Sequence, residues 1–369
     1  MNKRTRVLAA IGHQETDFVP YNFHAVPTVW KRVCELYGLA DNHAAAAFIG
    51  NHIVKIGSDF NYNPWASEVG QVQLTLSGGP VQTAVDAAGG LHTDEFGCVW
   101  DRSGGLPHPV RYPLGEVEGG AALAKALASY QIPDPFHAGR FDQAQQLADR
   151  YRGDLFLFGK LGMVLFERAW SIRGMQQLFI DMATEPQFVE DLLDRIVHEW
   201  NLPIIDQQLA LGIDGFYFSD DWGSTTQLMF SKKMWRRFIK PRLALIYDHC
   251  HRAGAVVGQH SDGAVSSLFP DLIEIGLDVF NPLQPHIMDP EEMKRQFGDK
   301  LCFYGGIDVE QTLPSGTPDE VRREIRSRAE VMGKGGGYIL QSSHTILEDT
   351  PDANLMAYID EVRAMAGMA

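Results

Sequence analysis

The stretch Ala255-Val-Val-Gly-Gln-His-Ser-Asp-Gly-Ala264 is the clearest strand end in the chain. An apolar run leads into it, and a glycine follows where the backbone can turn. Side chains at i and i+2 of a strand point to the same side. We therefore expect His260 and Asp262 to face one cavity, where they could bind a metal or act as an acid/base pair. The simpler alternative is a histidine that only hydrogen-bonds a loop carboxylate.

Seven further stretches have the composition of buried strands, and helical sequence separates the later ones. They are residues 19–24, 59–64 (as the end of a strand), 155–161, 215–221, 277–282, 301–306 and 337–342. Helices are expected at residues 3–11, 28–37 and 44–56 as well as between the later strands. Asp289-Pro-Glu-Glu and Thr317-Pro-Asp-Glu each combine a capping side chain, a proline in the first turn and a glutamate three residues on. Thr350-Pro-Asp repeats the cap and the proline.

Strands that alternate with helices predict a parallel sheet built from right-handed βαβ units. Eight strands fit an α/β fold of the (β/α)8 TIM-barrel type, and no G-x-G-x-x-G motif opens the first unit. The turn-rich, alternating sequence at about 69–112 predicts an irregular β-hairpin insertion. We therefore expect a single domain over residues 1–369 with that insertion. A flavodoxin-like sheet with a second domain is the structural alternative.

Composition limits the partners. The net charge of −15 argues against nucleic acid or an anionic membrane as the main partner. The four cysteines are scattered, as expected of thiols in a reducing compartment. The first residues are charged without an apolar run, and no stretch of about 18 apolar residues occurs. We expect a cytoplasmic protein that acts on a small molecule. The oligomeric state stays open, and a homodimer is compatible with the sequence.

In a barrel of this kind the active site lies at the carboxyl ends of the strands. Polar and aromatic side chains are concentrated there. They are His24, Trp65, Lys160, Asp220, Asp221, Trp222, His260, Asp262, Asn281, Gln284, Asp308 and His344. Each has a plain explanation, because loops are polar and most aromatic side chains belong to the core. Two histidines and several carboxylates at one mouth are nevertheless what a metal site or an acid/base site requires.

The chain resembles the uroporphyrinogen decarboxylase superfamily, whose members are (β/α)8 barrels. The resemblance rests on Gly258-Gln-His-Ser-Asp-Gly263, Phe303-Tyr-Gly-Gly-Ile-Asp308 and residues 6–20, 270–285, 335–339 and 343–354. It also implies one continuous helix over residues 231–253, in which Pro241 should cause a bend because proline removes a backbone donor. One branch of the superfamily decarboxylates uroporphyrinogen and grips its carboxylates with an arginine-rich amino-terminal loop. Residues 23–32 lack that signature, so uroporphyrinogen is not the expected substrate.

The other branch comprises zinc-dependent methyltransferases that serve corrinoid proteins. Its zinc ligands resemble a His-x-Cys at one strand end and a Cys at the last strand. The resemblance places His260 and Asp262 on the first pair and His344 on the final Cys. Two imidazoles and one carboxylate remain a competent ligand set for Zn2+. Without thiolates the metal would be more Lewis acidic and better suited to an oxygen ligand of the substrate.

We therefore expect a Zn2+-dependent methyltransferase or demethylase that moves a methyl group from a small O- or N-methyl compound to a corrinoid protein. In this interpretation His260, Asp262 and His344 hold the metal, and His344 also takes part in the chemistry. The expected roles of the others are substrate orientation or proton relay for Asp220 and Asp221, hydrogen-bond donation for Gln284, and substrate binding for His24, Trp65, Lys160 and Trp222.

Two alternatives stay open. The first is a cofactor-free decarboxylase of a small aromatic or pyrrolic acid. In that enzyme Asp220 would stabilise a protonated intermediate and His344 would transfer the proton. The second is a non-catalytic use of the barrel, because a fold does not determine a function.

Overall fold

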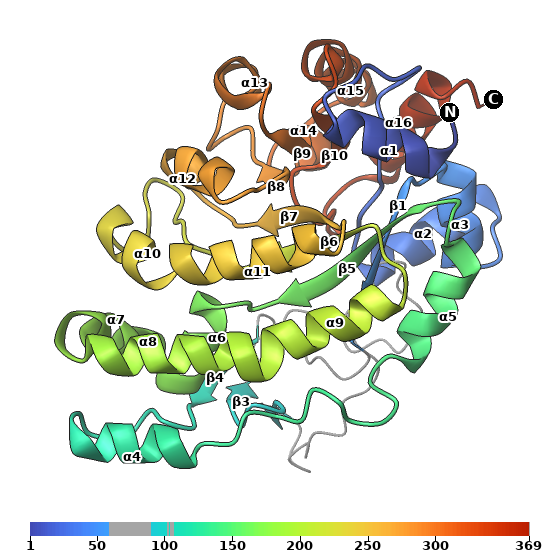
Figure 1. The fold of residues 1–369 in the computed structure, drawn as a ribbon. Coiled ribbons are helices and arrows are strands. Elements are labelled where there is room, and N and C mark those ends of the chain that lie inside the picture. Colours follow the sequence, from blue (N-terminus) through green and yellow to red (C-terminus); the bar gives the residue numbers. More distant parts are fainter. Residues whose placement is uncertain (59–89, 102, 104–106, 369) are drawn as a thin grey trace.

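The computed structural model describes residues 1–58, 90–101, 103 and 107–368 (Figure 1). Within these residues seven parallel strands form one curved sheet in the order β1-β5-β6-β7-β8-β9-β10. The strands are β1 (Ile53–Gly57), β5 (Phe156–Gly162), β6 (Gly215–Ser219), β7 (Val256–His260), β8 (Val279–Leu283), β9 (Cys302–Ile307) and β10 (Tyr338–Ser342). The six later strands lie where the sequence predicts them, to within a few residues at each end.

An irregular segment lies between the last and the first strand of the sheet. Residues 20–25 form no strand, although Tyr21 makes an isolated parallel bridge to Leu340. Asn22 N donates to Leu340 O at 2.9 Å, and His52 N donates to Tyr21 O at 3.2 Å. The prediction of a strand at residues 19–24 is therefore wrong. The segment contains a proline, which has no backbone N–H for a ladder, yet it links both edges of the sheet.

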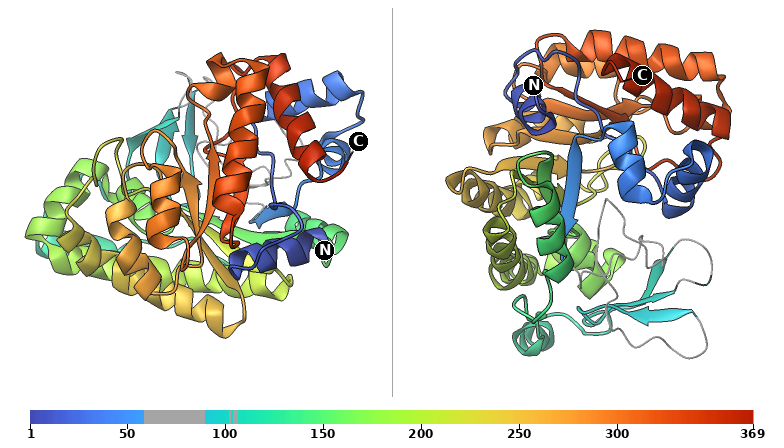
Figure 2. Two further views of the ribbon diagram at one scale, coloured as in Figure 1. Left: turned by 90° about the horizontal axis from the view of Figure 1, so that it is seen from above. Right: turned by 90° about the vertical axis from the view of Figure 1, so that its right-hand side faces the viewer.

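Helices connect successive strands and cover the outer face of the sheet (Figures 1 and 2). Those after β5 are α6 (Phe166–Arg173), α7 (Met175–Thr184), α8 (Pro186–Arg195), a π-helical turn at Ile196–Asn201, α9 (Leu202–Ala210), α10 (Lys232–Phe238), α11 (Lys240–Arg252), α12 (Phe269–Glu274), α13 (Pro290–Phe297), α14 (Thr312–Ser315), α15 (Pro318–Gly333) and α16 (Asp352–Met365). Those before it are α1 (Lys3–Ile11), α2 (Pro27–Tyr37), α3 (Asn42–Ile49), α4 (Ala121–Ser129) and α5 (Asp142–Tyr151). In the part of the chain that the structure describes, no helix has both the length and the apolar character for a membrane crossing.

Helix α1 closes the amino-terminal end of the sheet. Its Val7 and Ile11 belong to a buried cluster with Ile53 of β1 and Phe156 of β5. Arg4 N also donates to the carbonyl of the residue two before β5, at 3.1 Å. Apolar side chains of α1 thus pack against the interior at this end, and the strands finish at the opposite end.

The predicted helix over residues 44–56 is wrong in its second half. Helix α3 ends at Ile49, because Gly50 takes a left-handed conformation with φ +89°. The next residues form β1, which is buried along its whole length. The alanine-rich start of this stretch favours a helix, whereas Ile53, Val54 and Ile56 are β-branched and pack into the sheet.

The start signals of two later helices are confirmed and a third is wrong by one residue. Asp289 Oδ1 accepts from Glu292 N at 2.9 Å, and Thr317 forms a complete capping box with Glu320. The third helix, α16, begins at Asp352 with Pro351 as its N-cap residue, so Thr350 does not cap it.

The continuous helix predicted over residues 231–253 is also wrong. The structure has two helices, α10 and α11, separated at Ile239. Pro241 lies in the first turn of α11, where its missing N–H leaves no intrahelical bond unmade. The proline therefore starts a new helix instead of bending an existing one.

A small antiparallel sheet lies apart from the main sheet, beside α6 and α8 (Figure 2). Its strands are β2 (Leu91–Thr93), β3 (Val99–Asp101) and β4 (His108–Arg111), which agrees with the predicted hairpins. The strand end predicted at residues 59–64 and the part of the predicted insertion before residue 90 lie outside the described residues.

A buried carboxylate, Asp94, joins this small sheet to α6. Its Oδ2 accepts from Trp100 Nε1 at 3.1 Å and from Arg168 Nη1 of α6 at 3.4 Å.

We predict that Arg168→Met destabilises the chain by about 3 kcal/mol, because it leaves the buried Asp94 carboxylate without its cation. It also removes the guanidinium whose Cζ lies 3.7 Å from the centre of the Phe96 ring. Urea unfolding followed by tryptophan fluorescence measures the loss. Arg252→Met, which removes an exposed ion pair with Asp248, is the control and should cost less than about 1 kcal/mol. Equal midpoints for the two variants would contradict this account.

Candidate metal-binding site

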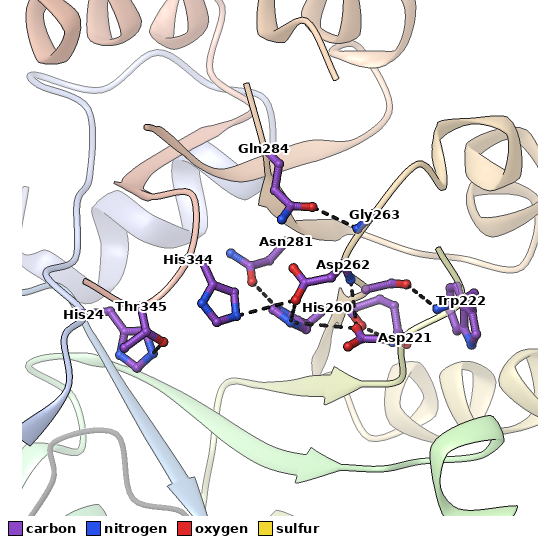
Figure 3. Close-up of polar contacts among 12 residues, drawn as sticks. His24, Asp221, Trp222, His260, Asp262, Gly263, Asn281, Gln284, His344 and Thr345 are labelled. Carbon is purple, nitrogen blue, oxygen red and sulfur yellow. Dashed lines mark hydrogen bonds and ion pairs between the residues drawn. The ribbon is translucent and has the colours of Figure 1, made fainter. Parts of the chain in front are cut away.

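Three side chains from two strand ends converge at the open end of the sheet (Figure 3). His260 is the last residue of β7, and His344 follows the end of β10 by two residues. The Asp262 carboxylate lies between them. Its Oδ2 is 3.8 Å from His260 Nε2 and 3.5 Å from His344 Nε2. One donor atom from each of the three lies within 4.8 Å of the other two.

This donor set fits one zinc ion. Tetrahedral ligands at 2.0–2.2 Å from zinc lie about 3.3–3.6 Å from one another. The two separations at Asp262 are close to that range before any ligand adjusts. Its other oxygen, Oδ1, is buried and has no hydrogen-bond partner among the described residues. Two imidazoles with one carboxylate are a ligand combination that zinc takes in catalytic sites.

Asn281, at the middle of β8, fixes the orientation of His260. Its Nδ2 donates to the carbonyl of Tyr304 at 2.8 Å, so its Oδ1 must be the acceptor that faces the imidazole. Nδ1 of His260 lies 2.6 Å from this oxygen and therefore carries the proton. Tyr217 O–H also donates to Asn281 Oδ1 and lies 2.8 Å from His260 Nδ1. The lone pair of His260 Nε2 is thereby directed toward Asp262 and His344.

The loops after β6 and β7 are joined closely enough to fix Asp262. Trp222 N donates to Ser261 Oγ at 3.0 Å. A Cβ on Gly223 would lie 2.7 Å from the carbonyl oxygen of Asp262, so only glycine permits this approach. Asp221 Oδ1 accepts from Asp262 N at 2.8 Å and lies 4.0 Å from His260 Nε2. Asp221 therefore both holds the loop and borders the site.

Two carboxyl groups, the half-buried Asp221 and the buried Glu167, border the site on its acidic side. Burial raises the pKa of Asp221; His260 opposes this shift and Asp262 adds to it. Burial raises the pKa of Glu167 well above its usual value, and Asp221 and Asp220 raise it further. These surroundings thus favour the protonated form of Glu167. It stands in the first turn of α6.

Asp220 and Trp222 lie close by but are fully buried. Asp220 accepts hydrogen bonds from the backbone N–H groups of Leu165, Phe166 and Glu167 at 3.3, 3.0 and 2.8 Å, and from Trp222 Nε1 at 2.7 Å. All four donors are internal, so the carboxylate anchors the start of α6 to the end of β6. The structure therefore gives both residues a supporting position and not one that faces a substrate.

The other predicted site residues are distributed around the same mouth. Gln284 Oε1 accepts from Gly263 N at 2.9 Å and so holds the loop that carries Asp262 (Figure 3). His24 Nε2 is 3.1 Å from Thr345 Oγ1, while its Nδ1 is buried without a partner among the described residues. Lys160 lies in β5 on the inner face. Trp65 lies outside the described residues.

The sequence reasoning missed Lys55, Tyr217 and Glu167. Lys55 stands in the middle of β1. It was missed because this stretch was predicted as part of a helix over residues 44–56. The available signal was a lysine inside the apolar run Ile53-Val-Lys-Ile-Gly57, since lysine is seldom fully buried without a reason. Glu167 gave no local signal, because only the packing of α6 against the loop after β6 brings it to the site.

We predict that Asp220→Ala lowers the free energy of unfolding by about 3 kcal/mol, because four buried donors lose their acceptor. Asp299→Ala, at an exposed acid, is the control and should leave the thermal unfolding midpoint unchanged. An Asp220→Ala variant with the midpoint of the parent chain would show that this carboxylate has no structural role.

Comparisons with known proteins identify the family and the fold. The family model "Uroporphyrinogen decarboxylase (URO-D)" matches residues 122–365. The uroporphyrinogen decarboxylase of Proteus mirabilis is 25% identical over 194 residues, which are 50% of each chain. That of Hamiltonella defensa is 23% identical over 250 residues, 64% of this chain and 66% of the relative. The chain thus spans about half to two thirds of the length of these curated relatives.

A solved structure shares the fold over the whole length. A methyltransferase from Methanosarcina mazei superposes with a TM-score of 0.68 and 16% identity, covering 99% of both chains. This likeness concerns the fold alone. Because the family model covers well over half of the residues, the chain belongs to the uroporphyrinogen decarboxylase (URO-D) family.

Proposed function

We propose that this protein is a zinc-dependent methyltransferase or demethylase of the URO-D family. It would take a methyl group from a small O- or N-methyl compound and pass it to a corrinoid carried by a partner protein. The observation that carries the proposal is the convergence of His260, Asp262 and His344 at separations that suit one ion. The methyltransferase name of the similar Methanosarcina mazei protein supports this class of reaction.

Each of these side chains would have a separate role. His260, Asp262 and His344 would hold the zinc ion, and Asn281 would keep the imidazole of His260 in the binding tautomer. When bound, zinc would supply Lewis acidity at the oxygen or nitrogen that carries the methyl group. A corrinoid on a partner protein would supply the acceptor for the methyl group, and the electron pair of the C–O or C–N bond would stay on the heteroatom. Glu167, whose raised pKa favours its protonated form, would protonate the departing heteroatom.

The absence of cysteine from the donor set favours an oxygen- or nitrogen-linked methyl donor. The structure describes all four cysteines, and none belongs to the group of possible ligands. Burial raises the pKa values of the Cys98, Cys250 and Cys302 thiols. None of these three thiols therefore provides a thiolate near the site.

A metal-independent decarboxylase is the second candidate, because the similar curated proteins are uroporphyrinogen decarboxylases. The side chain of Arg32, in the region where that branch binds carboxylates with arginines, is already occupied. It pairs with Asp352 and donates to the carbonyls of Glu348 and Thr350 at 3.0 and 2.8 Å. The two candidates differ in their need for a metal, which is directly measurable.

We predict about one zinc per chain in protein purified without added metal, measured by elemental analysis. His260→Ala should lose most of this zinc together with methyl transfer and still fold, since residues at strand ends serve function more than stability. His198→Ala, at an exposed histidine of the π-helical turn, is the matched control and should keep both. A zinc-free parent chain that releases CO2 from an acid would instead establish the decarboxylase.

Zinc affinity should fall as the pH drops, because both imidazoles must be neutral to bind. Burial lowers the pKa of His344, so at pH 7 its imidazole is neutral and available. Below the pKa of each imidazole, protons compete and affinity should fall about tenfold per pH unit for each ligand affected. Competition with a chromophoric chelator between pH 8 and 5 measures this dependence. A constant affinity over that range would exclude a site built on two histidines.

A further inference from the structure

Two lysines occupy the inner face of the sheet just below the candidate metal site. Lys55 of β1 is only 4% exposed. It lies two residues after Ile53, and Lys160 lies two residues after Phe158, where both apolar residues belong to the interior cluster. Side chains two apart on a strand share a face. Gly57 pairs with Lys160 across β1 and β5, so the two lysines are neighbours on the inner side.

Within the described ranges of the chain, neither lysine has a counter-charge. Among the described residues no carboxylate forms an ion pair with Lys55 or Lys160, and no hydrogen bond from either ammonium group occurs. The Nζ atom of Lys55 instead lies 3.5 Å from the centre of the Tyr217 ring and 5.4 Å from that of Tyr304. A cation–π contact offsets part of the cost of burying an ammonium group but does not replace an anion.

The surroundings of this pair are electropositive. Burial lowers the pKa of Lys55 well below its usual value, and Lys160 lowers it further. Burial also lowers the pKa of Lys160 to about 8. Burial lowers the pKa of His24 well below its usual value, and the two lysines lower it further. An anion placed among these three groups would relieve all of these penalties together.

The pair lies close to the candidate metal ligands. Tyr217, whose ring contacts Lys55, places its hydroxyl 2.8 Å from His260 Nδ1. Tyr217 is also the register partner of Lys160 across β5 and β6. One small molecule could therefore contact both a lysine and the ligand triad.

We propose that Lys55 and Lys160 form a carboxylate-binding subsite, and that the substrate is a small methylated carboxylic acid whose carboxylate contacts this pair. The identification of the methyl group rests on the proposed function, whereas the carboxylate subsite does not. A methoxy acid or an N-methyl amino acid has the required arrangement, with an anion at one end and a methyl-bearing heteroatom at the other. Two ammonium groups match one carboxylate through charge-assisted hydrogen bonds.

Calorimetric titration with benzoate tests the subsite, with benzyl alcohol as the neutral probe of the same size. The full chain is titrated as purified and again after removal of metal by a chelator, because a carboxylate could also bind to zinc. We expect benzoate to bind in both forms, and Lys55→Met and Lys160→Met each to weaken it by about tenfold or more. Lys125→Met, at an exposed lysine of α4, should leave the affinity unchanged. Benzyl alcohol should not distinguish the variants.

The Lys55→Met chain should fold, because it removes a buried ammonium that has no counter-ion, and its thermal unfolding midpoint should not fall below that of the parent. Lys160→Met provides an independent variant if it does. Benzoate affinity that is equal in all chains, or absent in the parent, overturns the subsite. Benzoate binding that needs zinc and ignores both lysines overturns it while leaving the proposed function intact. Lysine-dependent binding in a chain that takes up no zinc supports the subsite and overturns the proposed function.

Discussion

Parallel strands deliver their last residues to one end of a sheet, and this constraint organises the whole molecule. Helix α1 packs Val7 and Ile11 against the interior at the opposite end, and the three candidate metal ligands lie at the carboxyl ends. There, β7 supplies His260 and its loop supplies Asp262, while the segment after β10 supplies His344. Residues 84 positions apart in the chain, His260 and His344, thereby face one carboxylate.

Local periodicity explains what the sequence could predict. The six later strands are continuous apolar runs between helices, and the period of two correctly suggests that His260 and Asp262 share a side. Predictions failed where a neighbouring signal was stronger. The alanines before Gly50 led to a predicted helix that continued through β1. Lys55 was therefore not recognised as a buried residue of a strand. The role of Asp220 could not be read at all, because its three backbone donors come from residues about 55 positions earlier in the chain.

The site combines groups that are costly to bury. Lys55 has no counter-ion among the residues that the structure describes, and burial and neighbouring carboxylates raise the pKa of Glu167. Apolar residues at either place would make the chain more stable. Such groups are retained where a ligand compensates for them. A cationic pair and acidic groups near one donor triad suit a small molecule with an anionic end and a heteroatom that receives a proton.

Anomalous diffraction at the zinc edge, from crystals grown in the presence of zinc, tests the central claim most directly. The account predicts one strong peak about 2.0–2.2 Å from His260 Nε2, Asp262 Oδ2 and His344 Nε2, with a fourth position open toward Lys55 and Lys160. A well-ordered site with no peak between these three atoms, or a peak held by other side chains, would contradict it.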